Sequence, residues 1–554
     1  MRFICLFFMS FWFAAATLAG ERGDRAAVAM PDSFSAQVAS DVLASGGNAV
    51  DAAIAAQFVL AVTLPEAGNI GGGGFMLIHK DGGQYFLDYR ETAPGAASRD
   101  MFLDRDGAVV PDLSLYGVLA SGVPGTVAGM WQAHRRHGSM RWADLVQPAV
   151  ELAEKGFVVP DQLAREVADY AQAVGKTHPS VNFPQYFGRM RAGEVFRQPE
   201  LAATLRRIRE EGMDGFYRGE TAALIARFMR EEGGLITEAD LAAYKAKWRQ
   251  PIIAQWWGRE IVAAPPPSSG GIAVLQWLKM YDRATRDGES PAHNSPEYAH
   301  LLAEIGKRVF ADRAEYLGDP DFYAVPVNAL LAEGYIRKRS AELNLAEISP
   351  TPTVQPGLKE SEDTTHFSIL DRWGNAVSNT TTINLSFGSG VVVRGAGFLL
   401  NDEMDDFSVK PGVANVFGAL GGKANEIQPH KRMLSSMSPT IVLREGEVEM
   451  VTGSPGGTTI ITSVYQSILN ALAFDMSAQQ VVDSPRFHHQ LWPRDTIRHH
   501  RHMDASVLGD LSGMGYQLDP RGFGDLQVIL ERGGKLEAAS QSSGRGDSRV
   551  IFFD

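Results

Sequence analysis

The sequence predicts an α+β fold in which helices cover two stacked sheets, a layered α/β/β/α arrangement. Three observations carry this prediction. Helical patterns dominate the chain before residue 349, and strand patterns dominate it after residue 364. The 554 residues, 45% hydrophobic and 21% charged, are enough for a large core. Helices followed by sheet-rich segments in one chain favour packing in layers.

Two helices are expected near the start. Ser33 or Ser35 is expected to cap the first, which stops at the glycines 46–47. Asn48 precedes the second, residues 49–60, which is alanine-rich and almost without charge. A helix that is apolar on most faces is buried. The sequence therefore predicts a central helix close to the N-terminus.

Strand and helix signals then alternate along the chain. Residues 140–347 look mainly helical, with Asp161 and Thr237 as expected caps, and a polar, proline-containing stretch at 349–363 predicts a flexible connector and a candidate processing site. A helix is expected at about 459–473. The expected strands are 75–78, 365–371, 376–384, 440–443, 448–451, 526–530 and 550–553.

The N-terminal segment is typical of export. Met1 and Arg2 precede an apolar run, and small residues end at Ala19, so residues 1–19 are expected to be a signal peptide. An uncleaved membrane anchor is the alternative. The one cysteine, Cys5, lies in this segment, which leaves the exported chain without disulfides. A periplasmic or secreted bacterial protein, without stable membrane association, is expected.

Several classes of site are not expected. The net charge of −13, with no basic run, argues against nucleic acid. The glycines near residue 421 lack the spacing and the Ser or Thr of a phosphate loop, and those at 71–74 do not fit the dinucleotide-binding order. The histidines at 488–489 and 499–502 lack carboxylates or cysteines to complete a metal shell. We therefore expect neither a cofactor nor a metal.

Thr364 is the most distinctive candidate residue, because cleavage of the Asp363–Thr364 bond would give it a free α-amine beside its hydroxyl. Other short segments supply complementary chemistry. Glu403 and Asp406 are carboxylates, residues 431–440 hold paired hydroxyls, and the loop 453–457 can direct backbone N–H groups at an anion. Each alone could be an ordinary loop or cap, but their occurrence together in the last third of the chain argues against that interpretation.

These segments resemble the γ-glutamyltransferase family, whose members are made as one chain and cut themselves into a heterodimer with the N-terminal nucleophile (Ntn) hydrolase fold, a four-layer α/β/β/α sandwich. The resemblance covers nearly the whole chain. The matching segments are 46–53, 71–75, 90–94, 122–126, 311–313, 316–320, 364–366 and those around Ser435 and Gly453. It implies a large subunit, 20–363, and a small subunit, 364–554, that associate in one catalytic domain.

The resemblance also implies roles for individual residues. Thr364 would attack its own preceding peptide bond and then the γ-carbonyl of glutathione or a related γ-glutamyl compound, and the acyl group would pass to water or to an amino-acid or peptide acceptor. Thr382 would position the nucleophile, and Gly456 and Gly457 would form the oxyanion hole. The implied donor-binding residues are Arg90, Ser435 and Ser436 for the α-carboxylate, and Glu403, Asp406 and Asn384 for the ammonium.

The sequence departs from the family's pattern at two places, and two other functions are considered beside γ-glutamyl transfer. Phe417 stands where some bacterial members have a lid tyrosine, which favours hydrolysis over transfer, and the segment 539–545 lacks a common Asp-Pro-Arg pattern. A cephalosporin/glutaryl acylase of the same fold would have less need of an ammonium clamp, so Glu403 and Asp406 argue against it. A non-catalytic exported binding protein would not need Thr364.

Overall fold

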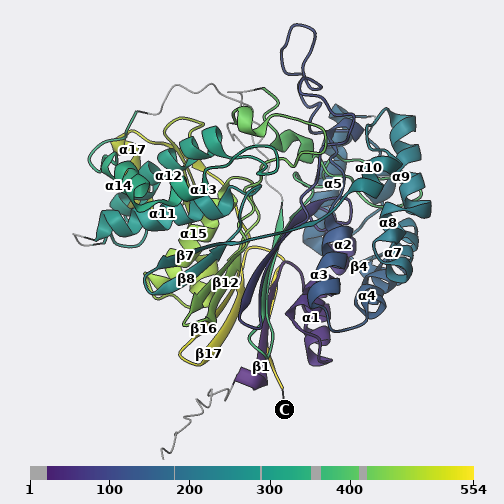
Figure 1. Ribbon diagram of the computed structural model, residues 1–554, viewed down its shortest axis with the longest axis horizontal. Coiled ribbons are helices and arrows are strands. Elements are labelled where there is room, and N and C mark those ends of the chain that lie inside the picture. Colours follow the sequence, from purple (N-terminus) through teal and green to yellow (C-terminus); the bar gives the residue numbers. More distant parts are fainter. Residues whose placement is uncertain (1–21, 180, 287–289, 351–363, 411–420, 554) are drawn as a thin grey trace, which may run out of the picture.

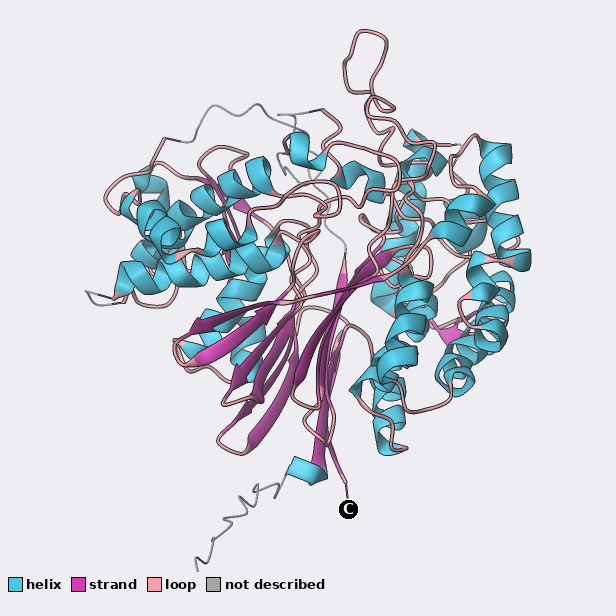
Figure 2. Ribbon diagram, viewed as in Figure 1, coloured by secondary structure: helices cyan, strands magenta, loops and turns pink. Residues whose placement is uncertain are grey.

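The computed structural model describes residues 22–179, 181–286, 290–350, 364–410 and 421–553. Two sheets stack in the centre, and a group of helices covers the outer face of each (Figures 1 and 2). This arrangement confirms the predicted four-layer α/β/β/α sandwich. Residues 1–21 and 351–363, which hold the expected signal peptide and most of the expected connector, lie outside the described residues.

The first sheet has seven strands in the order β18-β1-β9-β10-β2-β3-β6. The pairs are antiparallel, and Thr365 lies opposite Thr381 in the pair β9–β10. Strands from both sides of residue 364 therefore alternate within this sheet. Their bounds are β1 Arg25–Met30, β2 Gly73–Lys80, β3 Gly83–Asp88, β6 Lys247–Arg249, β9 Thr365–Leu370, β10 Ala376–Thr382 and β18 Asp547–Phe552.

The second sheet has six strands in the order β17-β16-β12-β11-β8-β7, also antiparallel. Their bounds are β7 Ile252–Trp256, β8 Arg259–Ala263, β11 Thr440–Arg444, β12 Glu447–Gly453, β16 Gln527–Arg532 and β17 Lys535–Ser540. Two small sheets lie outside the sandwich. They contain β4 Phe157–Val158 with β5 Val195–Phe196, and β13 Phe487–His488, β14 Thr496–His499 and β15 Gln517–Pro520.

The two helical layers come from different stretches of the chain (Figure 1). On the first sheet lie α1 Ser33–Ala44, α2 Ala49–Thr63, α3 Thr126–His137, α4 Trp142–Lys155, α5 Asp161–Thr177, α6 Phe183–Phe187, α7 Pro199–Glu211, α8 Asp214–Tyr217, α9 Gly219–Glu232 and α10 Glu238–Ala243. On the second lie α11 Gly270–Thr285, α12 Pro296–Tyr316, α13 Val327–Leu331, α14 Glu333–Ala341, α15 Thr459–Leu472, α16 Ala478–Asp483 and α17 Ala505–Met514. In the described parts of the chain, no helix has the length and apolar character required to cross a membrane.

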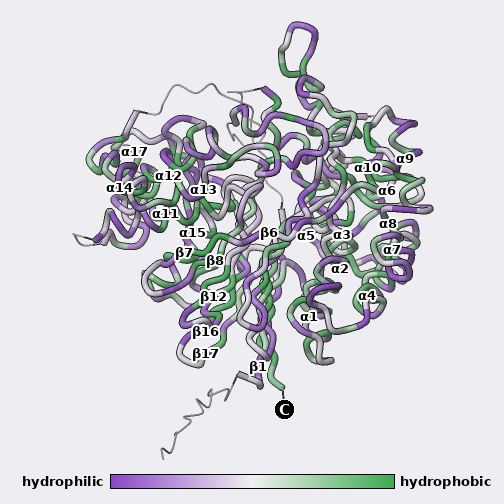
Figure 3. Tube along the Cα trace, viewed as in Figure 1, coloured by the Kyte–Doolittle hydropathy of each residue, from purple (hydrophilic) through white to green (hydrophobic). Residues whose placement is uncertain are grey.

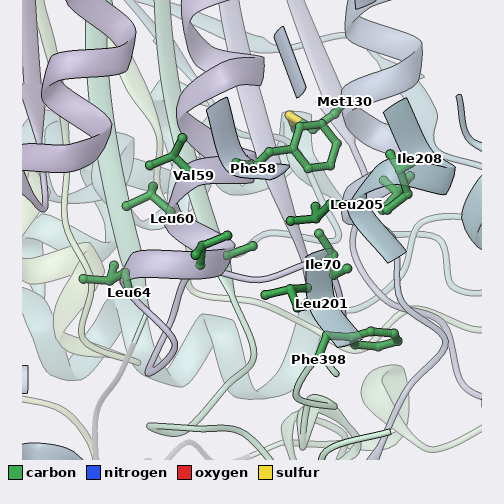
Figure 4. Close-up of a cluster of buried hydrophobic side chains, with 14 of the residues drawn as sticks. Phe58, Val59, Leu60, Leu64, Ile70, Met130, Leu201, Leu205, Ile208 and Phe398 are labelled. Atoms are coloured by element: carbon green, nitrogen blue, oxygen red, sulfur yellow. The ribbon is translucent and has the colours of Figure 1, made fainter. Parts of the chain in front are cut away.

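Alternating side chains on the first sheet divide the core into two layers. In β1, Val28 and Met30 face the helices while Ala27 and Ala29 face the second sheet, as expected from the two-residue period of a strand. Hydrophobic residues concentrate along the central strands (Figure 3). Helix α2 is buried along its whole length, as predicted, and Phe58 packs near Met130, Leu201, Leu205 and Ile208 (Figure 4).

Most predicted elements are present, and the caps show where the predictions were wrong. Asp32, rather than Ser33 or Ser35, caps α1, because its carboxylate accepts a 2.7 Å hydrogen bond from the Ser35 amide. Asp161 is the first residue inside α5 and does not cap it. Asn48 and Thr237 do cap α2 and α10, each in a capping box.

Strands β6–β8 lie in a region that was expected to be mainly helical. The signal that could have revealed them is the turn at Trp257-Gly258, where both residues have positive φ, between two five-residue segments that contain the β-branched residues Ile252, Ile253, Ile261 and Val262. The strands of both sheets meet at one end of the sandwich. There β9, β11 and β16 begin, while β3, β8, β10 and β12 end. This edge holds the candidate site.

Candidate active site

Thr364 lies immediately before β9, at the edge where the two sheets meet, and is 8% exposed. Its Oγ1 donates to Oγ1 of Thr382, at 3.4 Å, from the last residue of β10. The Thr382 oxygen also accepts a 2.8 Å hydrogen bond from the amide of Asn384. Because the pairing of β9 with β10 fixes both threonines, the candidate nucleophile is held by the sheet rather than by a loop.

The loop between β12 and α15 carries Gly456 and Gly457, each of which lines a cavity together with Thr364. Their φ angles are +124° and +50°, which L side chains rarely adopt. The Gly456 carbonyl accepts hydrogen bonds from the amide and the hydroxyl of Thr459, at 2.9 and 2.6 Å. These bonds tie the loop to the N-terminus of a 14-residue helix, whose dipole favours an anion at this position.

Arg90 is the central cation of the site and is 1% exposed. It follows β3, and its Nη1 lies 2.5 Å from Oε2 of Glu403, while its Nη2 pairs with Asp406. Both acids come from the 3₁₀ helix Glu403–Asp406. The expected cation and anions are therefore in direct contact in this structure, rather than at opposite ends of the cavity.

Burial controls the protonation of this cluster. It opposes the charge of Arg90, but Glu403, Asp406 and Glu91 together raise the pKa of the guanidinium. Burial also raises the pKa of Glu403 well above its ordinary value, although Arg90 acts against this shift. The pKa of Glu91, which neighbours Arg90, is raised to about 7 for the same reason. The cluster therefore holds more buried carboxyl groups than Arg90 alone neutralises.

A second buried guanidinium, Arg313, was not among the predicted site residues. It comes from α12, and its Nη2 and Nε donate to the hydroxyls of Ser436 and Ser269, at 3.1 and 3.0 Å. Burial lowers the pKa of Arg313 to about 10, so the group stays cationic at neutral pH. The sequence did carry a signal, since Arg313 lies in the segment 311–313 that contributes to the family resemblance.

One cavity brings the predicted residues together. It is lined by Arg90, Arg313, Thr364, Thr382, Asn384, Glu403, Asp406, Ser435, Ser436 and Gly457, among others. Gly456 lines a second cavity, which Thr364 also lines. Two guanidinium groups and two acidic side chains therefore face a small space that Thr364 also lines, a combination that suits a ligand with both a carboxylate and an ammonium. Phe417 lies outside the described residues, so its predicted effect on the lid stays a prediction.

The described residues include no group of three or more His, Cys, Asp or Glu side chains arranged to hold a metal ion. The histidines that drew attention in the sequence are mostly buried in the core of the second layer. Burial lowers the pKa of His488 to about 4, and its Nδ1 lies 2.7 Å from the hydroxyl of Thr462 on α15. His488 therefore has a packing role in this structure.

Comparison with known proteins identifies the relatives of this chain. The family model described as Gamma-glutamyltranspeptidase matches residues 35–551. A protein named glutathione hydrolase proenzyme, from Pseudomonas aeruginosa, is 54% identical over 532 residues, which is 95% of each chain. A protein of the same name from Escherichia coli is 44% identical and matches 92% of this chain and 88% of its own length.

Solved structures with similar folds also match this chain. A cephalosporin acylase from Bacillus halodurans superimposes with a TM-score of 0.82 at 25% identity, covering 98% of this chain and 99% of its own. A gamma-glutamyltranspeptidase from Pseudomonas nitroreducens, complexed with L-DON, has a TM-score of 0.57 at 52% identity. This match covers 96% of the solved chain and 59% of the present chain.

Proposed function

Because this chain belongs to the gamma-glutamyltranspeptidase family, we propose that it is a self-processing γ-glutamyl hydrolase and transferase acting on glutathione and related γ-glutamyl compounds. The observation that carries the proposal is the position of Thr364. Thr364 lines a cavity with Arg90, Glu403, Asp406 and Gly457, and it lines a second cavity with Gly456. A nucleophile, a binding site for a zwitterion and an anion-stabilising loop are the parts that such an acyl transfer needs.

Self-cleavage comes first. The Thr364 oxygen attacks the carbonyl carbon of Asp363, the peptide C–N bond breaks, and an ester joins the two parts. Water then hydrolyses this ester, which leaves a carboxylate on residue 363 and a free α-amine on Thr364. The products are subunits 20–363 and 364–554. The partial span of the Pseudomonas nitroreducens chain, close to the share that residues 20–363 make up, supports this division.

The mature site repeats the chemistry on a donor. The α-amine of Thr364, with an ordinary pKa of roughly 7.7–8.0, takes the hydroxyl proton as the oxygen attacks the γ-carbonyl. Backbone N–H groups of Gly456 and Gly457 stabilise the oxyanion, and the proton passes to the leaving amine as the C–N bond breaks. Water or an acceptor amine then attacks the γ-glutamyl ester and restores the Thr364 hydroxyl.

We call Arg90, Ser435, Ser436, Glu403 and Asp406 together the clamp, and its charges account for the proposed preference for a γ-glutamyl donor. The α-carboxylate of the donor would be bound by Arg90, Ser435 and Ser436, with Arg313 holding the Ser436 hydroxyl. Its ammonium would be bound by Glu403 and Asp406, with Asn384 nearby. A glutaryl side chain, as in the rival acylase function, has no ammonium to compensate these two acids. The charges of the cavity therefore favour γ-glutamyl donors over glutaryl ones.

The proposal includes a cellular location. Residues 1–19 have the pattern of a cleaved signal peptide, and the only cysteine of the chain lies among them. A bacterial periplasm or the medium is the compartment that suits an exported chain without disulfides. Amino acids and short peptides are the proposed acceptors.

Intact mass tests the proposal directly. Wild-type protein should give two chains that meet at residues 363/364 and should hydrolyse a γ-glutamyl anilide. Thr364→Ala should give one uncut, inactive chain. Thr365→Ala, at the neighbouring position, is a control that should still be cut. A wild-type chain that stays uncut and yet hydrolyses the anilide would overturn the assignment of Thr364.

A further inference from the structure

Asn384 and Glu403, two residues expected to bind the ammonium of the donor, lie at the two ends of one hairpin, residues 384–403. Backbone hydrogen bonds join the two arms of this hairpin. The amide of Ser389 donates to the carbonyl of Leu400 at 3.0 Å, and the amide of Leu400 donates to the carbonyl of Val391 at 2.9 Å. The hairpin therefore brings two side chains that line the same cavity together from separate positions along the chain.

Asp402 ties the two ends of the hairpin together and is fully buried. Its Oδ1 accepts a 3.0 Å hydrogen bond from the amide of Leu385. Nδ2 of Asn384 donates to the carbonyl of Asp402 at 3.1 Å and to its Oδ2 at 3.3 Å. The same carbonyl accepts the amide of Asp405, at 3.3 Å, at the start of the 3₁₀ helix that carries the two acids of the clamp. Asp402 does not line the clamp cavity, so it can act on a donor only through these neighbours.

The side-chain amide of Asn384 uses only its nitrogen within the protein. Among the residues that the structure describes, none donates a hydrogen bond to Oδ1 of Asn384. Both atoms that Nδ2 contacts, the carbonyl oxygen and Oδ2 of Asp402, are acceptors, so the opposite orientation of the amide would bring oxygen against oxygen. An ammonium can only donate hydrogen bonds, and an amide oxygen is therefore the end of Asn384 that suits it.

The backbone of Asn384 also depends on its neighbours. Its φ of +76° lies in the left-handed region, which asparagine adopts more readily than most other side chains. Its amide donates to Oγ1 of Thr382 at 2.8 Å, and Asp402 holds the amide of the next residue, Leu385. Removal of the Asp402 side chain would leave the buried Leu385 amide without its acceptor and would free Asn384 to leave this conformation.

The contacts of Asp402 do not require a charge. Burial raises the pKa of Asp402 well above its ordinary value, the hydrogen bond from Leu385 opposes this shift, and Asp405 and Asp406 add to it. A protonated carboxyl keeps acceptor capacity and can still receive the amide of Leu385. The amide oxygen of an asparagine at this position could do the same.

We propose that Asp402 is a positioning residue for donor recognition, which holds Nδ2 of Asn384 and thereby presents Oδ1 to the ammonium of a γ-glutamyl donor. The ammonium then meets the Asn384 oxygen in addition to Glu403 and Asp406. This inference rests on the proposed function, because it assigns the selection of a γ-glutamyl group over a glutaryl group to a residue behind the clamp.

The test compares two donors that differ only in the ammonium. Hydrolysis of a γ-glutamyl anilide and of the glutaryl anilide is measured as kcat/KM for each donor, and the ratio of the two values is taken for each variant. Wild type should prefer the γ-glutamyl donor by tenfold or more, as expected for a charge-assisted hydrogen bond that the glutaryl donor cannot make. In Asp402→Ala this ratio should fall by at least fivefold, mainly through KM of the γ-glutamyl donor. Asp402→Asn should keep the ratio within threefold of wild type, because the Leu385 amide and Nδ2 of Asn384 still find acceptors there.

Asp371→Ala is the matched control. Asp371 is also a buried acid, and its Oδ1 accepts the amides of Trp373 and Asn375, but it follows β9 at the end far from the site. Its ratio should equal that of wild type. An unchanged ratio in Asp402→Ala overturns the inference, even if both rates fall, because a general loss of structure affects both donors. A fall of the ratio in Asp371→Ala as large as in Asp402→Ala overturns it as well.

A second variant decides the matter if Asp402→Ala does not fold. Asn384→Gly removes the side-chain amide and suits the φ of +76°, so its ratio should fall at least as far as predicted for Asp402→Ala. An unchanged ratio in Asn384→Gly means that the ammonium does not use this amide, which overturns the inference. A wild type that hydrolyses neither donor overturns the proposed function itself.

Discussion

Replacing Arg90 by lysine tests the clamp most sharply, because it keeps the charge and changes only the geometry. The two Nη atoms of Arg90 contact two different carboxylates, Glu403 and Asp406. A lysine has one ammonium on a flexible stem and cannot reproduce this fork. Arg90→Lys should therefore leave one buried carboxylate, or the donor carboxylate, without its partner.

The magnitude follows from the number of contacts. Loss of one charge-assisted hydrogen bond costs about 1.5–3 kcal/mol, which corresponds to a fall in kcat/KM of roughly ten- to 150-fold. The measurement is steady-state hydrolysis of a γ-glutamyl anilide, expressed per cut chain as determined by mass. If the donor carboxylate is the group that loses its partner, much of the effect should appear in KM.

Arg259→Lys is the control for this experiment. Arg259 also binds one carboxylate through two nitrogens, Nε to Oε2 of Glu449 at 2.5 Å and Nη2 to Oε1 at 3.0 Å, but it starts β8 at the end of the sheet far from the site. Its replacement should leave kcat/KM unchanged. The clamp does not bind the donor if kcat/KM of Arg90→Lys stays within twofold of wild type. The same conclusion follows if kcat/KM of Arg259→Lys falls as far as that of Arg90→Lys.

Three further predictions concern the loop, the acid cluster and the nucleophile. Gly456→Ala should lower kcat/KM by about a hundredfold, because φ of +124° strains alanine where an oxyanion donor is needed, whereas Gly446→Ala, at φ of +84° in a β-turn with open space, should retain activity. Glu91→Gln should change how the free energy of unfolding depends on pH. The folded-state pKa of the Glu91 carboxyl is raised from 4.5 to about 7, so its contribution to stability is fully present below pH 4.5 and is lost as the pH rises through 7. In urea unfolding, the free energy of unfolding of the variant should therefore gain up to about 3 kcal/mol relative to wild type between pH 5 and pH 8, and a difference that does not change with pH would contradict this. Thr382→Val should lower kcat about tenfold with little change in KM, and Thr382→Ser should restore it, since only the hydroxyl contacts Thr364 and the Asn384 amide; equal rates for the Val and Ser variants would refute the positioning role.

The sequence predicted the parts of the molecule that local patterns determine. The apolar run 49–60 indicated the buried helix α2, and the alternating segments after residue 364 indicated β9 and β10. Thr364 could be selected because its chemistry depends on its own backbone amine. The layered packing followed from the order of these segments.

What the sequence could not provide is proximity between distant segments. Arg90 and Glu403 are 313 positions apart, and only the structure shows them in contact. Arg313 and Ser436 meet because α12 and the loop before β11 approach the same end of the sandwich. The strands β6–β8 were not predicted because they are short and lie between long stretches with helical patterns. Roles that depend on such contacts follow from the fold and not from spacing.

The interleaved order of strands in the first sheet has a mechanical consequence for the two-chain protein that the proposed self-cleavage would produce. β9 and β10 lie between β1 and β2, so a break at residue 363 leaves the two fragments threaded through one hydrogen-bonded sheet. They cannot separate without tearing several rows of backbone hydrogen bonds and opening both core layers. The fragments should therefore stay together on extreme dilution, and the specific activity of the processed protein should not depend on its concentration.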